Sequence, residues 1–537
     1  MEKNNNQPVV IIAGAGPAGL MTACQLSLLN VPFRIVEKKP QPSSHSGAMI
    51  IYTRTLEIFQ QLGLTEKMFR QGTVVKGLRV LFNGKESSSF DIFNKATNLS
   101  AFPFILMIEQ SKTEVLLLDF LKENGHNVEW GTEVVDLHDQ ENEVEVTLRL
   151  PQGKLEIITT SYLIAADGDK SRIRDLLNIS FKGKTHRTKL TIIECDADVD
   201  FQPGELGFAF SKHATAGFFP LTVGRWRIDT SIYGMRNNNR QYTFEKVAGL
   251  FNRKTGLGAN LKNPGWFSVF YSHSKYANQF SKNRCFLVGD AAHVFTPVGG
   301  QGMNTGLQDA HNLAWKIGLV SQNKLVPQVL DTYEKERQPV AEKICKRSGS
   351  YFKLAASGLP HYKIFRQSLL PVLLKLFFKA LKFNSVAEYF FKKLSGTGIT
   401  YGLNLLNKDA SRTIYMSAPK PGEKLPFLNY IEKGNIVSLQ DKVQNGKFLL
   451  LIFGDKVNAD LLLNAIKGYQ DVLSSIVLPF NQDTSNIYLR FGINTEGWYL
   501  IRPDMVVACR SDEPGAEELK AYLHTLFIIN RNGGRQS

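Results

Sequence analysis

The sequence predicts an α/β protein in which a mostly antiparallel β-sheet is inserted into a first α/β unit, and a second α/β unit follows. Three observations predict this fold. Residues 8–37 read as strand, Gly-rich turn, helix and strand. Residues 181–280 change to short strands with glycine, proline and aromatic residues. From about Gly402, strand and helix patterns alternate again. We therefore expect a first domain over 1–180 and 281–400, an inserted sheet domain over 181–280, and a last domain over 401–537.

Composition indicates an ordinary globular protein. Of the 537 residues, 43% are apolar and 21% are charged, and the net charge is +15. A basic balance permits nucleic acid, a membrane surface or an anionic small molecule as partner, and it selects none of them. The five cysteines are scattered without a CxxC pair, which argues against a disulfide framework and a zinc site. With no signal-peptide pattern and no apolar run long enough to span a membrane, we expect a cytoplasmic protein.

The turn after the first strand predicts a dinucleotide site. Residues 8–13 form a continuous apolar run, and Gly14-x-Gly16-x-x-Gly19 opens the helix. Glu37 ends the next strand, 18 residues after Gly19. Glycines at these positions allow a tight bend, the approach of a pyrophosphate and close packing of helix on strand, while the acid accepts hydrogen bonds from a ribose. We therefore predict a Rossmann-like domain, although this turn alone does not separate NAD(P) from FAD.

Other patterns place the remaining elements. Residues 143–150 alternate and predict a half-buried antiparallel strand, whereas 162–166 and 284–290 predict buried strands. A helix should span about 302–320, and helices should occupy 340–395 as a connection to the last domain. There the predicted order is strand 448–453, helix 459–469, strands 474–478 and 487–492, a hairpin over 498–509 and a helix over 516–527.

A second motif favours FAD. Asp290 follows a buried strand, and a turn from Pro297 to Gly302 leads into the next helix. A carboxylate at that position can hold a polyol hydroxyl. The amides of a helix N-terminus can stabilise the negative charge of a reduced flavin.

These motifs resemble those of the FAD-dependent aromatic hydroxylases of the para-hydroxybenzoate hydroxylase and phenol hydroxylase type. GAGPAG at 14–19, Asp167-Gly168 after a buried strand, and GDAAHVFTPVGGQGMNTG at 289–306 match that family's motifs in order. The resemblance covers essentially the whole chain, and the last block resembles the thioredoxin-like C-terminal domain of the longer members. It implies an FAD-binding domain, an inserted β-sheet substrate domain and a thioredoxin-like α/β domain.

The resemblance also implies roles for individual residues. Gly14, Gly16, Gly19 and Glu37 would hold the ADP half of FAD, Asp290 the ribityl chain and Gln110 the flavin, while Asp167 is linked to both FAD and the nicotinamide cofactor. The full set of implied cofactor-binding residues is Gly14, Ala15, Gly16, Pro17, Ala18, Gly19, Glu37, Lys38, Gln110, Asp167, Asp290, Pro297, Gly300, Gln301, Gly302, Met303 and Asn304. One departure is Gly47, where the family often has a basic residue near the flavin.

The implied activity is an NADPH-dependent monooxygenase that uses O₂ to hydroxylate a phenolic or polyketide-like aromatic substrate through a C4a-hydroperoxyflavin, with NADH as an open alternative. Since the flavin carries the chemistry, we expect no catalytic acid/base pair and no metal. Baeyer–Villiger or epoxidising attack is a second reading, and a non-catalytic flavin-binding interaction protein a third. We expect no nucleic-acid partner, because no basic stripe with stacking aromatic residues is seen. The substrate and the oligomeric state, with a homodimer as one option, stay open.

Several residues have a structural interpretation as well. We interpret His293 and His311 as structural, and the 453–456 segment, which lacks cysteine, as redox-inert. The aromatic residues of the inserted sheet suit either a substrate pocket or the core of that sheet; they are Phe208, Phe210, Phe218, Phe219 and Trp226.

A basic amphipathic helix is predicted from Pro371 to Phe383. Between Lys343 and Lys393 there are 11 basic residues and one acid, Glu388. Lysines 375, 379 and 382 share one face, opposite an apolar face. We expect that apolar face to pack on the FAD domain, and we treat attachment to an anionic membrane as the less favoured alternative.

Overall fold

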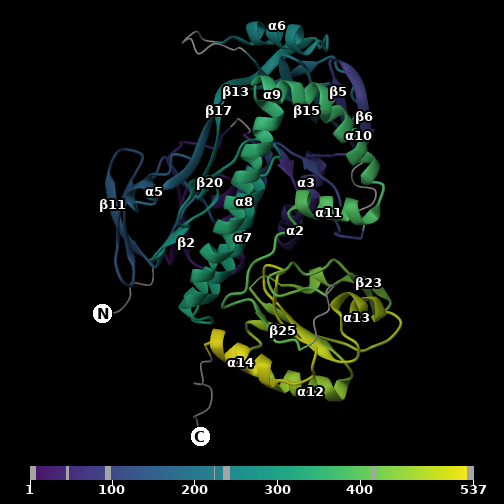
Figure 1. Cartoon of the computed structure of the whole chain (residues 1–537). Helices are drawn as coiled ribbons and strands as arrows, with labels where there is room; N and C mark the ends of the chain where they lie inside the picture. Colours follow the sequence, from purple (N-terminus) through teal and green to yellow (C-terminus); the bar gives the residue numbers. More distant parts are fainter. Residues whose placement is uncertain are drawn as a thin grey trace.

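We describe a computed structural model of the chain, which defines residues 8–43, 47–90, 98–222, 224–233, 242–412, 418–444 and 446–528. Three sheets organise it, of six, eight and five strands. In Figure 1 the eight-stranded sheet lies at the top, the six-stranded sheet below it, and the yellow C-terminal block at the bottom. No helix of the described residues is long and apolar enough to cross a membrane.

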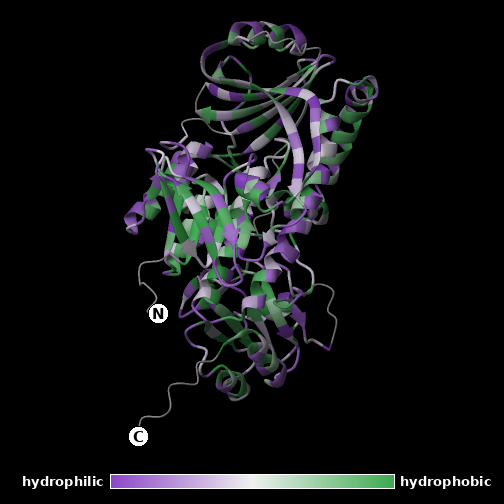
Figure 2. Ribbon diagram, turned by 90° about the vertical axis from the view of Figure 1, so that its left-hand side faces the viewer, coloured by the Kyte–Doolittle hydropathy of each residue, from purple (hydrophilic) through white to green (hydrophobic). Residues whose placement is uncertain are grey.

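The six-stranded sheet carries the Gly-rich turn. Its order is β18 (Ser281–Lys282), β19 (Cys285–Leu287), β12 (Tyr162–Ala165), β1 (Val10–Ala13), β2 (Phe33–Glu37) and β8 (Val128–Trp130). All neighbours pair in parallel except β18 and β19. Every residue of β1 and β12 is buried, as the continuous apolar runs predict. The hydrophobic colour of Figure 2 is concentrated in this part of the molecule.

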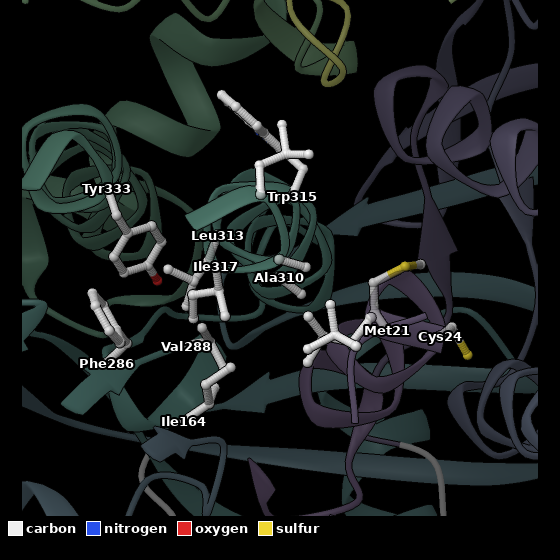
Figure 3. Close-up of a cluster of buried hydrophobic side chains, with 14 of the residues drawn as sticks. Met21, Cys24, Ile164, Phe286, Val288, Ala310, Leu313, Trp315, Ile317 and Tyr333 are labelled. Carbon is white, nitrogen blue, oxygen red and sulfur yellow. The ribbon is translucent and has the colours of Figure 1, made fainter. Parts of the chain in front are cut away.

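Three helices pack beside this sheet: α1 (Pro17–Leu28), α4 (Gln110–Glu123) and α7 (Gly302–Ser321). Figure 3 shows part of the resulting core, to which Met21 of α1, Ile164 of β12 and Ala310 of α7 all contribute. The predicted helices after both Gly-rich turns are confirmed. A small sheet of β9 (Glu133–Asp139), β10 (Val144–Arg149) and β11 (Leu155–Thr160) adjoins, and β10 confirms the predicted antiparallel strand.

The eight-stranded sheet is wider than its expected range. Its order is β20 (His293–Val294), β17 (Leu261–Ala277), β13 (Phe181–Ala197), β16 (Arg225–Ile232), β15 (Ala214–Thr222), β14 (Glu205–Phe210), β5 (Gly77–Phe82) and β6 (Lys85–Phe90). It is antiparallel except where β14 pairs with β5. Because β5, β6 and β20 come from outside residues 181–280, the inserted segment supplies only the middle of the sheet. Helix α6 (Phe244–Thr255) contacts β15, β16 and β17.

Shorter elements connect the two sheets. They are the strands β3 (Ile50–Ile51), β4 (Thr73–Val74) and β7 (Leu106–Met107), which form a sheet of their own, and the helices α2 (Thr53–Gln61), α3 (Thr65–Gln71) and α5 (Arg172–Leu176).

A helical connection leads to the last block through α8 (Asp331–Ala356), α9 (Pro360–Ile364), a π-helical turn (Phe365–Leu369), α10 (Leu370–Ala380) and α11 (Asn384–Ser395). The basic helix packs on residues 78–90, which lie inside the range 1–180 expected for the FAD domain but belong to the eight-stranded sheet. Phe378 of α10 stacks on Phe90 of β6 with ring centroids 5.4 Å apart, and α10 contacts β6. The helix covers β5 and β6 because those strands extend the sheet to an edge that sequence patterns did not reveal.

The C-terminal block has the sheet order β21 (Lys408–Asp409), β27 (Val507–Ser511), β26 (Gly497–Ile501), β24 (Phe448–Phe453) and β25 (Leu473–Leu478). Helices α12 (Lys456–Ala465) and α14 (Glu517–Leu526) match predicted ones. The predicted strand at 487–492 is wrong, because α13 (Ser485–Phe491) is a helix. Its buried residues Ile487, Tyr488 and Phe491 follow a helical spacing. A small hairpin of β22 (Asn429–Glu432) and β23 (Asn435–Ser438) adjoins.

Candidate active site

The three glycines of the first turn meet different surroundings. A Cβ on Gly14 would lie 2.2 Å from the carbonyl oxygen of Ala166, and one on Gly19 would lie 1.9 Å from that of Gly14. A Cβ on Gly16 would meet nothing within 4 Å. Gly14 and Gly19 therefore allow the turn, β12 and α1 to pack closely. Gly16 instead faces open space beside the first turn of α1, where an anion can approach free backbone N–H groups.

That open space belongs to a cavity of about 520 Å³ between the six-stranded and eight-stranded sheets. It brings together residues from motifs far apart in the sequence. The predicted cofactor residues that line it are Gly16, Pro17, Ala18, Glu37, Lys38, Gln110, Asp167, Asp290, Pro297, Gly300, Gln301, Gly302 and Met303. A second cavity, of about 310 Å³, shares Glu37, Lys38 and Asp167 with the first.

The other four predicted residues lie beside the large cavity. Gly14 lines the second one, and the Ala15 N–H donates to the Glu37 carboxylate at 2.8 Å. Gly19 is packed against Gly14. Asn304 links α7 to residues 50–52, because its side-chain amide donates to Ile50 O at 2.7 Å and accepts from Tyr52 N at 2.9 Å. These residues shape the cavity wall.

Two acids at strand ends are suited to hold hydroxyl groups. Asp167 follows β12; one carboxylate oxygen accepts from Ile173 N at 3.2 Å, while Oδ1 is buried without a partner. Asp290 follows β19 and is exposed to the cavity. Desolvation by the surrounding protein raises the pKa of Asp290 to about 6, against the attraction of His293, and burial also raises the pKa of Asp167. Each acid therefore offers an acceptor that a ligand hydroxyl could satisfy.

Two residues from separate elements, α4 and β16, form hydrogen bonds with the backbone of Gly47 and Ala48. Gln110 on α4 accepts from Ala48 N at 3.0 Å, and its amide donates to Glu114 at 2.8 Å. Arg227 on β16 donates to the Gly47 carbonyl oxygen at 2.9 Å and pairs with Asp229 at the same distance. A positive charge thus lies beside Gly47, supplied by the eight-stranded sheet.

The far wall of the cavity is formed by this sheet. Its lining residues are Ile192, Phe219, Arg227, Asp229, Trp266, Ser268 and Phe270. Sequence reasoning named only Phe219 among them. The missed signal is alternation along β16, since Trp226 and Ile228 join the core under α6 while Arg227 and Asp229 face the cavity. Phe218 likewise lies in that core, next to Phe219.

Both histidines have the contacts of structural residues. His293 is fully buried and pairs with Asp309 at 2.5 Å, and Asp309 also pairs with Arg337 at 2.7 Å. His311 contacts Gln61 at 2.7 Å, and desolvation lowers its pKa to about 3, so its ring is neutral. Within the described residues, no group of three or more His, Cys, Asp or Glu could hold a metal ion.

The cavity residues fit an FAD. Gly16 leaves room at a helix N-terminus for a pyrophosphate, and Asp167 Oδ1 is a buried acceptor without a partner. The turn Pro297–Gly302 opens α7 toward the same cavity, so the positive end of a second helix faces it.

Comparison with known proteins agrees with this fit. Residues 7–348 match the family described as "FAD binding domain". The chain is 29% identical to a 6-methylpretetramide 4-monooxygenase of Streptomyces rimosus, over 97% of this chain and 94% of that protein. It is 26% identical to a pentachlorophenol 4-monooxygenase of Sphingobium chlorophenolicum, over 94% and 93%.

Solved structures share the fold. The ternary complex of aklavinone-11 hydroxylase with FAD and aklavinone superposes with a TM-score of 0.80 at 23% sequence identity. The superposition covers 97% of this chain and 99% of that chain. The family match spans the Gly-rich turn, Asp167 and the Asp290 motif, the same segments that meet at the cavity. The chain therefore belongs to the FAD-binding aromatic hydroxylase family and is an FAD-dependent monooxygenase.

Proposed function

We propose that this enzyme hydroxylates a phenolic or polyketide-like aromatic substrate bound against the eight-stranded sheet. One observation carries the proposal: a single cavity joins the Gly16 turn and Asp290 to an aromatic wall that includes Phe219, Trp266 and Phe270. Such a wall suits a planar ring, since aromatic side chains contact rings through stacked or edge-on faces. Relatives that act on pentachlorophenol or 6-methylpretetramide, by their names, support an aromatic substrate class.

The chain's own residues would bind and orient both FAD and the aromatic substrate. Gly16 would leave room for the pyrophosphate beside the turn that Gly14 allows. Glu37 and Asp167 would hold hydroxyl groups of the ADP half, and Asp290 would hold the ribityl chain. FAD supplies the redox and oxygen-transfer chemistry when it is bound. The N-terminal amides of α7 would place positive potential beside the flavin. The wall of the sheet would hold the substrate ring in position and keep water away from the reacting atoms.

We further propose that NADPH, or NADH, is the reductant and that O₂ is the second co-substrate, as the family relationship suggests. Asp167 would serve both nucleotides because it lines both cavities. The proposed oxygen transfer needs no acid/base side chain.

We propose that the C-terminal block is thioredoxin-like and redox-inert. The strand order β25-β24-β26-β27, with β24 and β25 parallel and the others antiparallel, supports this arrangement. The segment directly after β24, residues 454–472, contains no cysteine. Cys509 is buried, and burial raises its pKa to about 12, so it is a poor thiolate nucleophile.

Substrate-stimulated oxidation of NADPH tests the proposed activity. The FAD-loaded enzyme is screened against phenols and aromatic polyketides, with O₂ uptake and product mass measured together. We expect slow oxidation without substrate, faster oxidation with the correct aromatic compound, and a product that gains one oxygen atom. Equal rates with and without every compound tested would contradict the proposal.

A cavity variant and a surface variant sharpen this test. Trp266→Ala removes part of the aromatic wall and should raise KM about tenfold or more at unchanged FAD content. Tyr389→Ala changes an exposed ring and should leave the kinetics as they are. The position of the new oxygen, found by NMR, separates the chemistries, because Baeyer–Villiger attack would insert it beside a carbonyl and epoxidation would bridge two carbons.

A further inference from the structure

Helix α10 carries apolar side chains on two sides. Its inner side is accounted for by packing, because Phe378 and Leu381 are buried against Val80, and Leu374 and Phe377 join the same cluster. These four residues belong to the apolar face that the sequence predicts, and the edge of the eight-stranded sheet covers them. The fifth residue of that predicted face, Leu373, is exposed instead.

The other side remains exposed. Leu369, Val372, Leu373 and Leu376 are 49%, 53%, 41% and 58% exposed, and Phe383, just after the helix, is 68% exposed. Spacings of three, four and seven residues put the first four side chains on one helical face. We call these five residues the outer stripe. Single exposed apolar residues are ordinary, whereas a row along one helix face marks a contact surface.

The lysines beside the outer stripe indicate what kind of partner can bind there. Lys375 and Lys379 are exposed on α10 beside the outer stripe, and Lys382 is exposed just after the helix. From Lys343 to Lys393 the chain has 11 basic residues and one acid. A second copy of this chain would bring the same lysines face to face, and like charges repel. The occupant of this surface must therefore be anionic as well as apolar.

We infer that the outer stripe docks α10 on an anionic lipid surface. The helix would lie in the plane of the interface, with Leu373 and Leu376 among the acyl chains and the lysines at the headgroups. Attachment would be peripheral and would depend on both apolar contact and charge. The sequence pattern favours simple solvation of these lysines, but packing accounts for only one of the two apolar sides.

Co-sedimentation of the full-length, FAD-loaded protein with vesicles tests the inference. Phosphatidylcholine vesicles are compared with vesicles that also contain phosphatidylglycerol, at low and high salt. We expect binding to the anionic vesicles alone and its loss at high salt, because screening weakens the lysine contacts. Absence of binding to anionic vesicles at low salt would overturn the inference.

Two variants and two controls locate the contact. K375E/K379E/K382E should reduce binding by about a hundredfold, and V372S/L376S should weaken it by about tenfold or more. The controls K122E/K154E/K467E and L461S/L489S change exposed residues on other elements and should bind like the parent. Equal loss in variants and controls, or no loss in either α10 variant, would refute the inference.

All variants must keep their FAD content and melting temperature, and analytical ultracentrifugation records their mass. If the V372S/L376S change converted a dimer to a monomer without affecting vesicle binding, a second copy would be the occupant and the lipid assignment would be wrong. Failure of this inference would leave the proposed hydroxylation untouched, because the assay needs no turnover.

Discussion

At the scale of single residues, Asp290 is the most direct test of the cofactor site. Asp290→Ala should lose most of its bound FAD and remain folded, because the side chain faces the cavity and contributes no core packing. The FAD-to-protein absorbance ratio and the circular dichroism spectrum measure the two effects. Asp471→Ala changes an exposed acid far from the cavity and should keep its FAD. A fully yellow Asp290→Ala protein would disprove the assignment.

The raised pKa of Asp290 gives this prediction a pH dependence. The ionised carboxylate is the better acceptor for a ribityl hydroxyl, so FAD affinity should fall as the pH drops through about 6. The FAD-free fold should respond with the opposite sign. A carboxyl whose folded pKa is raised favours folding while it is protonated, and that contribution is lost as the pH rises through about 6. The FAD affinity and the free energy of unfolding of the FAD-free protein, each measured across this pH range, test the two effects. Asp290→Asn should flatten both curves.

The cofactor side of this site could be predicted from sequence better than the wall formed by the eight-stranded sheet. Gly14, Gly16, Gly19 and Glu37 follow a spacing fixed by local backbone geometry, so a single sequence reveals them. Arg227 and Trp266 reach the cavity only because β16 and β17 present one face to it. Alternation shows that the strand has two faces, but it does not say which face meets a cavity and which meets α6. Strand pairing across the chain decides that.

At the scale of elements, the turn between β1 and α1 contains one glycine that packing requires and another that FAD binding requires. Gly19→Ala would force a Cβ to within 1.9 Å of a carbonyl oxygen, and we expect it to destabilise the fold by about 2–4 kcal/mol. Gly16→Ala meets no atom within 4 Å and should change FAD-free stability by less than about 0.5 kcal/mol, while greatly weakening FAD binding. Urea unfolding of both FAD-free variants and FAD titration measure the contrast. Equal FAD affinity of Gly16→Ala and the parent would contradict the assigned role of this glycine.

Helix α13 shows why short elements are harder to predict than long ones. Residues 487–492 mix β-branched and aromatic residues that favour strands, yet tertiary packing selects a helix of seven residues. Phe491 and Tyr488 contact Phe453, and Gly492 ends the helix with a left-handed φ of 66°. In a segment this short, periodicity cannot separate the two structures, whereas the 20 residues of α7 can be recognised from sequence.

At the scale of the whole molecule, a buried charge network joins the last block to the FAD domain. Arg502, in the turn after β26, pairs with Glu336 of α8 at 2.9 Å and with Asp504 at 2.6 Å. Lys316 of α7 pairs with Glu336 at 2.8 Å. These side chains are almost wholly buried. Sequence patterns show only that each residue is charged. They could not show that Arg502 pairs with Glu336, which is 166 positions away in the sequence.

Arg502 should stabilise this junction more than Lys316 does. Arg502→Met leaves Glu336 and Asp504 buried beside one cation, and we expect a loss of about 3–5 kcal/mol in the free energy of unfolding. Lys316→Met leaves Glu336 paired with Arg502 and with the Asn312 amide at 2.8 Å. Desolvation already lowers the pKa of Lys316 to about 8. We therefore expect the free energy of unfolding to fall by no more than about 1 kcal/mol. Urea unfolding measures both, and limited proteolysis should release the C-terminal block from Arg502→Met first. Equal losses would mean that apolar packing around Trp315 and Phe448, rather than this network, holds the junction together.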